Sequence, residues 1–218
     1  MMKVEDKRKK GEKGFWSKIA KRYDKWIDRA FADQYEAFKS KISSYMQPDD
    51  AVLEVGTGTG EIAFHIADHC KKVVGIDISP EMVTIANRKK NETDIKNVTF
   101  QVEDAYELPF ADSSFDKVIC INALQTMKEP LKAIMEGKRV LKEGGEFISI
   151  TYCYGDSSFL EKLKLIKWVI LYGFPKYWNN FSRNELTGYF ERVNFKVIEK
   201  EDVWKKPIVL FLRCGKVT

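Results

Sequence analysis

Short apolar runs alternate with helical segments through the middle of the chain, and this alternation constrains the fold more than any other feature. The apolar runs cover residues 51–55, 72–77, 97–104, 115–122 and 146–153. Helical patterns fill several of the intervals between them, one starting at Ser79 and Pro80, which suit an N-cap and a first helical position. This order predicts right-handed crossovers and a mainly parallel sheet covered by helices.

The C-terminal part departs from this alternation. Helices are expected over 157–172 and 182–192, and two further apolar runs follow at 195–203 and 207–215. Because only a few residues separate these last runs, they can form an antiparallel pair but not a parallel crossover. The predicted fold class is therefore α/β: a Rossmann-like, doubly wound, mostly parallel seven-stranded sheet with an antiparallel C-terminal hairpin and helices on both faces.

The first 13 residues hold six Lys or Arg and three Asp or Glu, so +3 of the chain's net charge of +5 lies there. We expect a flexible basic tail over 1–13, followed by N-terminal helices within 15–46 and one domain over 14–218. The remaining net charge of +2 provides no evident basic groove, so nucleic acid is not an expected partner.

Composition narrows the class of protein. Hydrophobic residues make up 44% of the chain and charged residues 32%, which is typical of a globular protein. No apolar stretch approaches the ~18–20 residues of a spanning helix, and the start has no apolar signal core, so a cytoplasmic location is expected. The four cysteines lie far apart without a CxxC pair, which favours buried reduced thiols over a metal site.

The segment VLEVGTGTG, residues 52–60, ends the first strand and opens a helix around three alternate glycines. Glycines there permit positive φ and close approach of a ligand to the backbone, and the helix start offers free N–H groups. The pattern Gly58-x-Gly60-x-x-Ala63, with Asp77 at the end of the second strand, also fits a looser nicotinamide dinucleotide fingerprint. The glycines alone therefore leave two cofactor classes open.

Two further carboxylates favour one of these classes. Glu54 precedes the glycines, where it would repel a pyrophosphate but attract an ammonium group. Asp104 ends the third strand, where it can accept a hydrogen bond from an adenine amine. A ligand with a carboxylate, an ammonium, a ribose diol and an adenine satisfies all these groups at once, and S-adenosylmethionine is such a ligand.

These residues also carry a family resemblance. The chain resembles class I S-adenosylmethionine-dependent methyltransferases, in the type 11, ubiquinone/menaquinone methyltransferase-like group. The matching motifs, in order, are FWSKIAKRYDKWID, LEVGTGTG, VVGIDISPEMV, VEDAYELPF, FDKVICINALQ and RVLKEGGEFIS, and they span about residues 15–152. Their order and spacing carry the resemblance more than any one motif does.

The resemblance implies a role for each motif in binding S-adenosylmethionine, or the product S-adenosylhomocysteine. The glycine-loop backbone lines the methionine portion, Glu54 helps hold the amino group, and Asp77 accepts from both ribose hydroxyls. Ile78 and Met82 flank the adenine, while Asp104 and the Ala105 backbone meet its amine. The complete set of expected cofactor-binding residues is Tyr23, Glu54, Gly56, Thr57, Gly58, Gly60, Asp77, Ile78, Met82, Asp104, Ala105 and Asn122.

Some roles stay open at this stage. For Tyr23, which would cover the cofactor, and for Asn122, near the reacting centre, packing or a turn is an alternative to ligand contact. No catalytic residue is assigned, because methyl transfer needs a general base only if the nucleophile loses a proton. His65 and His69 have i, i+4 spacing, but no third ligand is suggested, so no metal is expected.

The apolar segment 159–178, with interspersed lysines, bears on the substrate. One hypothesis makes it, within an insertion over 157–181, a lid over the site, resting on a membrane surface to admit a lipid-like or aromatic acceptor. The alternative is ordinary core packing against the N-terminal helices. The overall expectation is methyl transfer to a small molecule; the alternatives are a NAD-dependent oxidoreductase and a non-catalytic S-adenosylmethionine-binding module. The sequence does not determine the oligomeric state.

Overall fold

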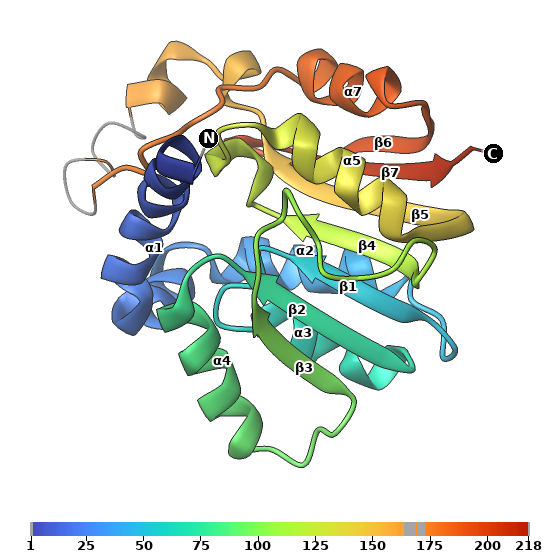
Figure 1. Cartoon of the computed structure of the whole chain (residues 1–218). Coiled ribbons are helices and arrows are strands. Elements are labelled where there is room, and N and C mark those ends of the chain that lie inside the picture. Colours follow the sequence, from blue (N-terminus) through green and yellow to red (C-terminus); the bar gives the residue numbers. More distant parts are fainter. Residues whose placement is uncertain (1, 164–168, 170–172, 218) are drawn as a thin grey trace.

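The computed structural model describes residues 2–163, 169 and 173–217 and contains one seven-stranded sheet with helices on both faces (Figure 1). The strand order is β3-β2-β1-β4-β5-β7-β6. The strands are β1 (Ala51–Val55), β2 (Lys72–Asp77), β3 (Val98–Val102), β4 (Phe115–Ile121), β5 (Leu141–Tyr152), β6 (Phe195–Lys205) and β7 (Ile208–Lys216). The described α-helices with assigned bounds are α1 (Met2–Ala30), α2 (Ala32–Ser43), α3 (Glu61–Ile66), α4 (Pro80–Asn91), α5 (Pro130–Val140) and α7 (Arg183–Arg192).

The pairing pattern confirms the predicted fold class. Strands β1 to β5 pair in parallel, and β7 pairs antiparallel with both β5 and β6. From β1 the chain runs outward to β2 and β3, then returns to β4 on the other side of β1. In such sheets, ligands bind outside the carboxyl ends of the strands where the order reverses. The loops after β1 and β4 lie at that position.

Each face of the sheet has its own apolar core. Val52 and Ile119 belong to the cluster under α2, α3 and α4, whereas Leu53 and Val118 belong to the cluster under α5 and α7. Successive residues of a strand point to opposite faces, and burial of both faces explains why the central strands read as unbroken apolar runs. All four cysteines are buried and unpaired, as the sequence predicts.

The N-terminal tail is a correction. Helix α1 begins at Met2, so residues 2–13, expected to form a flexible tail, are its first turns. The side chains of Arg8 and Glu12 are buried against the loops that follow β3 and β4. These two charged side chains hold the start of α1 against the domain, because their partners lie far away in the sequence. The composition of the segment alone does not reveal such partners.

A second difference concerns the end of α5. The sequence places the fifth apolar run, and with it the expected strand, at residues 146–153. In the structure, β5 already begins at Leu141, which pairs with Phe115, and the next pair is Glu146 with Lys117. Residues 142–145 form an irregularity within the strand, which allows glycines to occur inside it.

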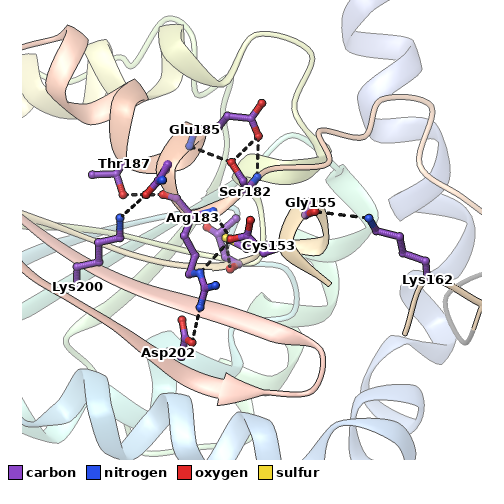
Figure 2. Close-up of polar contacts among 12 residues, drawn as sticks. Cys153, Gly155, Lys162, Ser182, Arg183, Glu185, Thr187, Lys200 and Asp202 are labelled. Atoms are coloured by element: carbon purple, nitrogen blue, oxygen red, sulfur yellow. Dashed lines mark hydrogen bonds and ion pairs between the residues drawn. The ribbon is translucent and has the colours of Figure 1, made fainter. Parts of the chain in front are cut away.

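The insertion after β5 leaves and rejoins the body at one point. A short 3₁₀ helix, η3 (Tyr154–Asp156), follows β5, and residues 159–163 are helical; the rest of the helix expected over 157–172 lies largely outside the described residues. The Gly155 N–H donates to the Phe181 carbonyl at 2.8 Å. Arg183 joins Asp156 to Asp202 of β6. Figure 2 shows the contact between Arg183 and Asp202. The two ends of the inserted segment 157–181 therefore lie close together, at a narrow stem.

Gly155→Ala tests this stem. A Cβ at Gly155 would lie 2.7 Å from the Ser182 nitrogen and 2.8 Å from the Asn180 oxygen, both backbone atoms. We expect the free energy of unfolding to fall by about 1–3 kcal/mol, as in other overpacked sites. The control is Gly188→Ala in α7, where a Cβ meets nothing within 4 Å. This control should gain about 0.5–1 kcal/mol. Equal effects of the two substitutions in urea denaturation would contradict the crowded stem.

Candidate active site

A cavity lies at the carboxyl ends of β1, β2, β3 and β4, at the point where the strand order reverses. Nine of the twelve residues expected from the sequence line it: Tyr23, Gly56, Gly58, Asp77, Ile78, Met82, Asp104, Ala105 and Asn122. Glu54, Thr57 and Gly60 lie behind this wall. The topology thus gathers side chains that are up to 99 residues apart, 122 − 23, into one site.

The glycine loop has the backbone conformation that its sequence predicts. Gly56 and Gly58 have φ values of 76° and 56°, which residues with a Cβ rarely adopt. The N–H groups of Gly56 and Thr57 both donate to the Ile76 carbonyl, at 2.8 and 2.9 Å. A Cβ at Gly56 would lie 2.5 Å from that of Ala123, so the loop packs directly against the segment after β4.

Asp77 ends β2 and is held by backbone donors. Its Oδ2 accepts from the Gly58 N–H and its Oδ1 from the Ser79 N–H, both at 2.9 Å. Burial raises the pKa of this carboxyl to about 6, although the N–H donors oppose the rise. Each oxygen retains a further lone pair, so the carboxylate can still accept two hydroxyl groups from the cavity.

Glu54 is buried behind the glycine loop, with 2% of its surface exposed. It accepts a hydrogen bond from the Thr57 hydroxyl at 2.5 Å. Burial is the main reason that its pKa rises to about 8, and the negative charges of Asp77 and Glu61 add to the rise. A cation arriving in the adjacent cavity would favour the ionised form.

Asp104 is paired with cations of α1. Arg8 forms a hydrogen-bonded ion pair with it, the Lys9 Nζ lies 3.3 Å away, and the Tyr106 N–H donates to its Oδ1 at 3.1 Å. Burial opposes ionisation, but the Arg8 contact and the Tyr106 N–H outweigh it, so the pKa of Asp104 lies below its ordinary value. The carboxylate expected to meet an adenine amine therefore already has charged partners.

Glu12 fastens the start of α1 across two loops. It accepts from Arg8 at 2.5 Å, from the Tyr106 hydroxyl at 2.7 Å and from the Lys128 N–H at 2.9 Å. The Arg8 guanidinium also lies 4.3 Å from the centre of the Tyr106 ring. Sequence reasoning missed Glu12, and also Trp16, which lines the cavity; their only local signal was helical spacing in α1.

The Tyr-Asp pair of α1 contacts the glycine loop. Tyr23 lines the cavity next to Gly58, and its hydroxyl lies 3.1 Å from that of Tyr35. Asp24 accepts from the Thr59 hydroxyl at 2.5 Å and pairs with Lys89 at 2.8 Å. Tyr23 also packs against the apolar core, so packing is one of its roles, and contact with the cofactor stays a prediction.

A second cavity, of about 250 Å³, adjoins the first and is mostly aromatic. Trp16, Tyr23, Asn122 and Thr126 line both cavities, so the two share a wall. The other aromatic rings around the second cavity are those of Trp26, Phe31, Tyr35, Tyr152, Tyr154 and Trp178. An apolar space next to a polar cavity with carboxylates suits a second, hydrophobic reactant.

The described residues of the segment 159–178 contact both the aromatic cavity and the core, and the lid stays a prediction. Pro175 and Trp178 line the aromatic cavity, and Trp178 also packs against the core. Phe159 and Leu160 are 74% and 69% exposed. Residues 164–168 and 170–172 lie outside the described part, so the structure leaves the choice between lid and core open for them.

Comparison with known proteins decides between the cofactor classes. The sequence profile of a family described as "Methyltransferase domain" matches residues 46–197, well over half of the chain. The chain belongs to the class I S-adenosylmethionine-dependent methyltransferases. Members of this family use S-adenosylmethionine, so the family favours that cofactor class over a nicotinamide dinucleotide for the glycine loop.

Relatives narrow the group within the family. The methyltransferase is 31% identical over 172 residues to the demethylmenaquinone methyltransferase of Symbiobacterium thermophilum, covering 76% of this chain and 64% of that protein. It is 30% identical over 137 residues to the ubiquinone/menaquinone biosynthesis C-methyltransferase of Zymomonas mobilis, covering 62% and 57%. The chain spans about half to two thirds of the length of such curated relatives.

A solved structure supports the fold independently. A chain in the complex between the Haloferax volcanii Trm112 methyltransferase activator and the putative methyltransferase superposes with a TM-score of 0.75 at 22% identity. The match covers 93% of this methyltransferase and 98% of that chain. At this identity the likeness establishes the shared architecture.

The histidines are placed away from this chemistry. His65 lies 2.8 Å from the Ser43 hydroxyl of α2, and its ring is 6.0 Å from that of His69. Among the described residues, no group of three or more His, Cys, Asp or Glu side chains could hold a metal ion.

Glu54→Gln should stabilise the methyltransferase at high pH. Because folding raises the pKa of Glu54 from 4.5 to about 8, the wild type loses stability relative to the neutral variant as pH rises through this interval. We expect a gain of roughly 2–4 kcal/mol at pH 9 and little difference at pH 4.5. Urea denaturation of both proteins at the two pH values measures it, and a gain independent of pH would contradict the buried titration.

Proposed function

We propose that this chain transfers the methyl group of S-adenosylmethionine to a small hydrophobic or aromatic acceptor. The observation that carries the proposal is the wall shared by two cavities, one with the carboxylates of the cofactor motifs and the other aromatic. S-adenosylmethionine supplies a methyl group activated by a positively charged sulfur. With this cofactor bound, the acceptor's nucleophile would donate an electron pair to the methyl carbon. The electron pair of the broken carbon–sulfur bond would stay on sulfur, which leaves the neutral thioether S-adenosylhomocysteine.

The polar cavity has the right groups to hold such a cofactor. Asp77 accepts hydrogen bonds from the ribose hydroxyls. The hydrogen bond from the Gly58 N–H holds its carboxylate in position at the wall of the cavity. The open space over Gly58, where even a Cβ would find only Tyr23 at 3.7 Å, admits the methionine portion next to the backbone. Glu54 lies behind the glycine loop, where it accepts a hydrogen bond from Thr57. Its negative charge favours binding of the cofactor's amino group.

The adenine end is formed by apolar and charged groups together. Ile78 and Met82 contact the flat faces of the base, and Ala105 offers its backbone at the edge. Asp104 accepts from the adenine amine with lone pairs that Arg8 and Lys9 leave free. Helix α1 thereby closes over this end, because its cations share the carboxylate with the cofactor.

Alignment and water exclusion account for the catalysis that we propose. Tyr23 and Asn122 lie on the shared wall, where they direct the acceptor toward the methyl carbon. Burial keeps the pKa of Tyr23 well above its ordinary value and that of Tyr35 at about 12, so both hydroxyls stay protonated near neutral pH. We therefore assign no general base to these tyrosines.

The acceptor is inferred to be hydrophobic from the second cavity and from the surface beside it. Four of the exposed large apolar side chains, Phe159, Leu160, Leu163 and Phe174, belong to the segment that lines this cavity. Curated relatives are named for quinone methylation, which also concerns hydrophobic aromatic molecules. We propose that this segment admits the acceptor, with contact to a lipid surface as its route. None of the described helices is long and apolar enough to cross a bilayer.

Asp77→Ala tests the cofactor assignment. Loss of a charged hydrogen-bond acceptor should weaken binding of S-adenosylhomocysteine by about 1–3 kcal/mol, measured by calorimetry on the folded variant. The control is Asp94→Ala, on an exposed loop after α4, which should leave the affinity unchanged. An unaltered affinity in the Asp77 variant would contradict the ribose contact.

Turnover tests the reaction itself. With tritiated S-adenosylmethionine, we expect label to pass to an alkylated 1,4-naphthohydroquinone in detergent micelles and not to glycine, since the second cavity is apolar. A protein that binds S-adenosylhomocysteine but labels no acceptor in a broad hydrophobic panel would instead be a binding module. Saturation by NADH with no heat from S-adenosylhomocysteine would sink the proposal.

A further inference from the structure

Two amide side chains on the wall of the aromatic cavity have oxygens without partners. Gln125 is 3% exposed, and its Oε1 has no hydrogen-bond partner within the described residues. The Oδ1 of Asn122 is likewise buried and unpartnered in this part of the chain. Both residues line the aromatic cavity, and Asn122 also lines the cofactor cavity. Buried carbonyl oxygens are usually satisfied, so such a pair points to a missing donor.

The surrounding bonds fix the orientation of the Gln125 amide. Its Nε2 donates to the Asn122 carbonyl at 3.0 Å, so Oε1 is the end that remains available. The 3₁₀ turn η2 (Leu124–Thr126) that carries Gln125 is tied down as well, because the Asn179 N–H donates to the Gln125 carbonyl at 2.6 Å. The Asn179 side chain donates to the Met127 carbonyl, also at 2.6 Å. Solvation of this oxygen by outward movement of the turn would break these bonds.

Four hydroxyl groups around the cavity, those of Tyr23, Tyr35, Tyr152 and Thr126, already have partners. Those of Tyr23 and Tyr35 lie 3.1 Å from each other, and the Tyr152 hydroxyl donates to the Oε1 of Gln34 at 2.5 Å. The Thr126 hydroxyl donates to the Ala123 carbonyl at 2.9 Å. The lining also holds the Tyr154 hydroxyl and the charged side chains of Glu161 and Lys206. Among the described lining residues, the amide oxygens of Gln125 and Asn122 are the buried side-chain acceptors that have no hydrogen-bond partner.

We infer that the acceptor substrate carries an O–H or N–H group that donates to Gln125 Oε1, with Asn122 Oδ1 as a second acceptor near the cofactor. This inference rests on the proposed function and narrows its substrate class. A donor-bearing acceptor is selected because an ether or hydrocarbon of the same shape leaves both oxygens unpaired, and that penalty discriminates strongly between close analogues. Gln125 is therefore a specificity-determining residue. It is the last residue of the motif FDKVICINALQ, but no role was assigned to it from the sequence.

The test compares three probes of nearly equal shape: 1-naphthol, 1-naphthylamine and 1-methoxynaphthalene. Calorimetry uses the full chain saturated with S-adenosylhomocysteine. We expect 1-naphthol or 1-naphthylamine, or both, to bind wild type at least about tenfold more tightly than the ether, which is about 1.4 kcal/mol. The two donor probes distinguish a hydroxyl acceptor from an amine acceptor.

Gln125→Leu, with Gln125→Met as a second apolar replacement, should reduce this preference to within about twofold. A purely structural role for Gln125 would instead weaken all three probes alike and preserve their ratio. Either that result, or equal binding of the three probes to wild type, or no binding of any of them, would overturn the inference.

The same experiment keeps the two proposals apart. If S-adenosylhomocysteine itself fails to bind, the proposed function fails first. If it binds and the donor preference is absent, only the inference about the acceptor fails.

Discussion

The structure depends on the burial of a parallel sheet on both faces. Because the central strands carry apolar side chains above and below, polar chemistry is confined to the strand ends. The reversal of strand order beside β1 then opens a space at one of those ends. Glu54, Asp77 and Asp104 stand at the tips of three strands around this space, and Asn122 stands at the tip of a fourth. The site is thus a consequence of how the core is built.

The same burial sets the electrostatics of the site. Glu54 and Asp77 lose solvation, so their pKa values rise, whereas Asp104 is compensated by Arg8 and Lys9. The ionised forms of Glu54 and Asp77 are therefore disfavoured by burial, whereas the charge of Asp104 is balanced by the cations of α1. A positively charged ligand beside Glu54 would offset part of this desolvation cost, whereas a diphosphate would add repulsion.

Most of the fold and the centre of the site were predictable because their signals are local. Strand periodicity, the glycines and Asp77 lie within short motifs, and the hairpin followed from one short link. The docking of α1 was not predictable, because Arg8 and Asp104 are 96 residues apart in the sequence. The composition of a basic segment does not reveal whether its cations are solvated or paired with a distant carboxylate. Gln125 escaped notice for a similar reason: a lone glutamine after a strand acquires meaning only from the bonds that orient it.

The narrow stem at Gly155 and Phe181 has a consequence for how such a protein can diversify. An insertion whose two ends meet through one backbone hydrogen bond can be exchanged for another without moving the strands on either side. The Arg183 bridge to Asp156 and Asp202 belongs to the body and would survive such an exchange (Figure 2). Evolution, or an engineer grafting loops, could in this way change the acceptor of the proposed methyl transfer and leave the proposed nucleoside-binding residues at the strand ends in place.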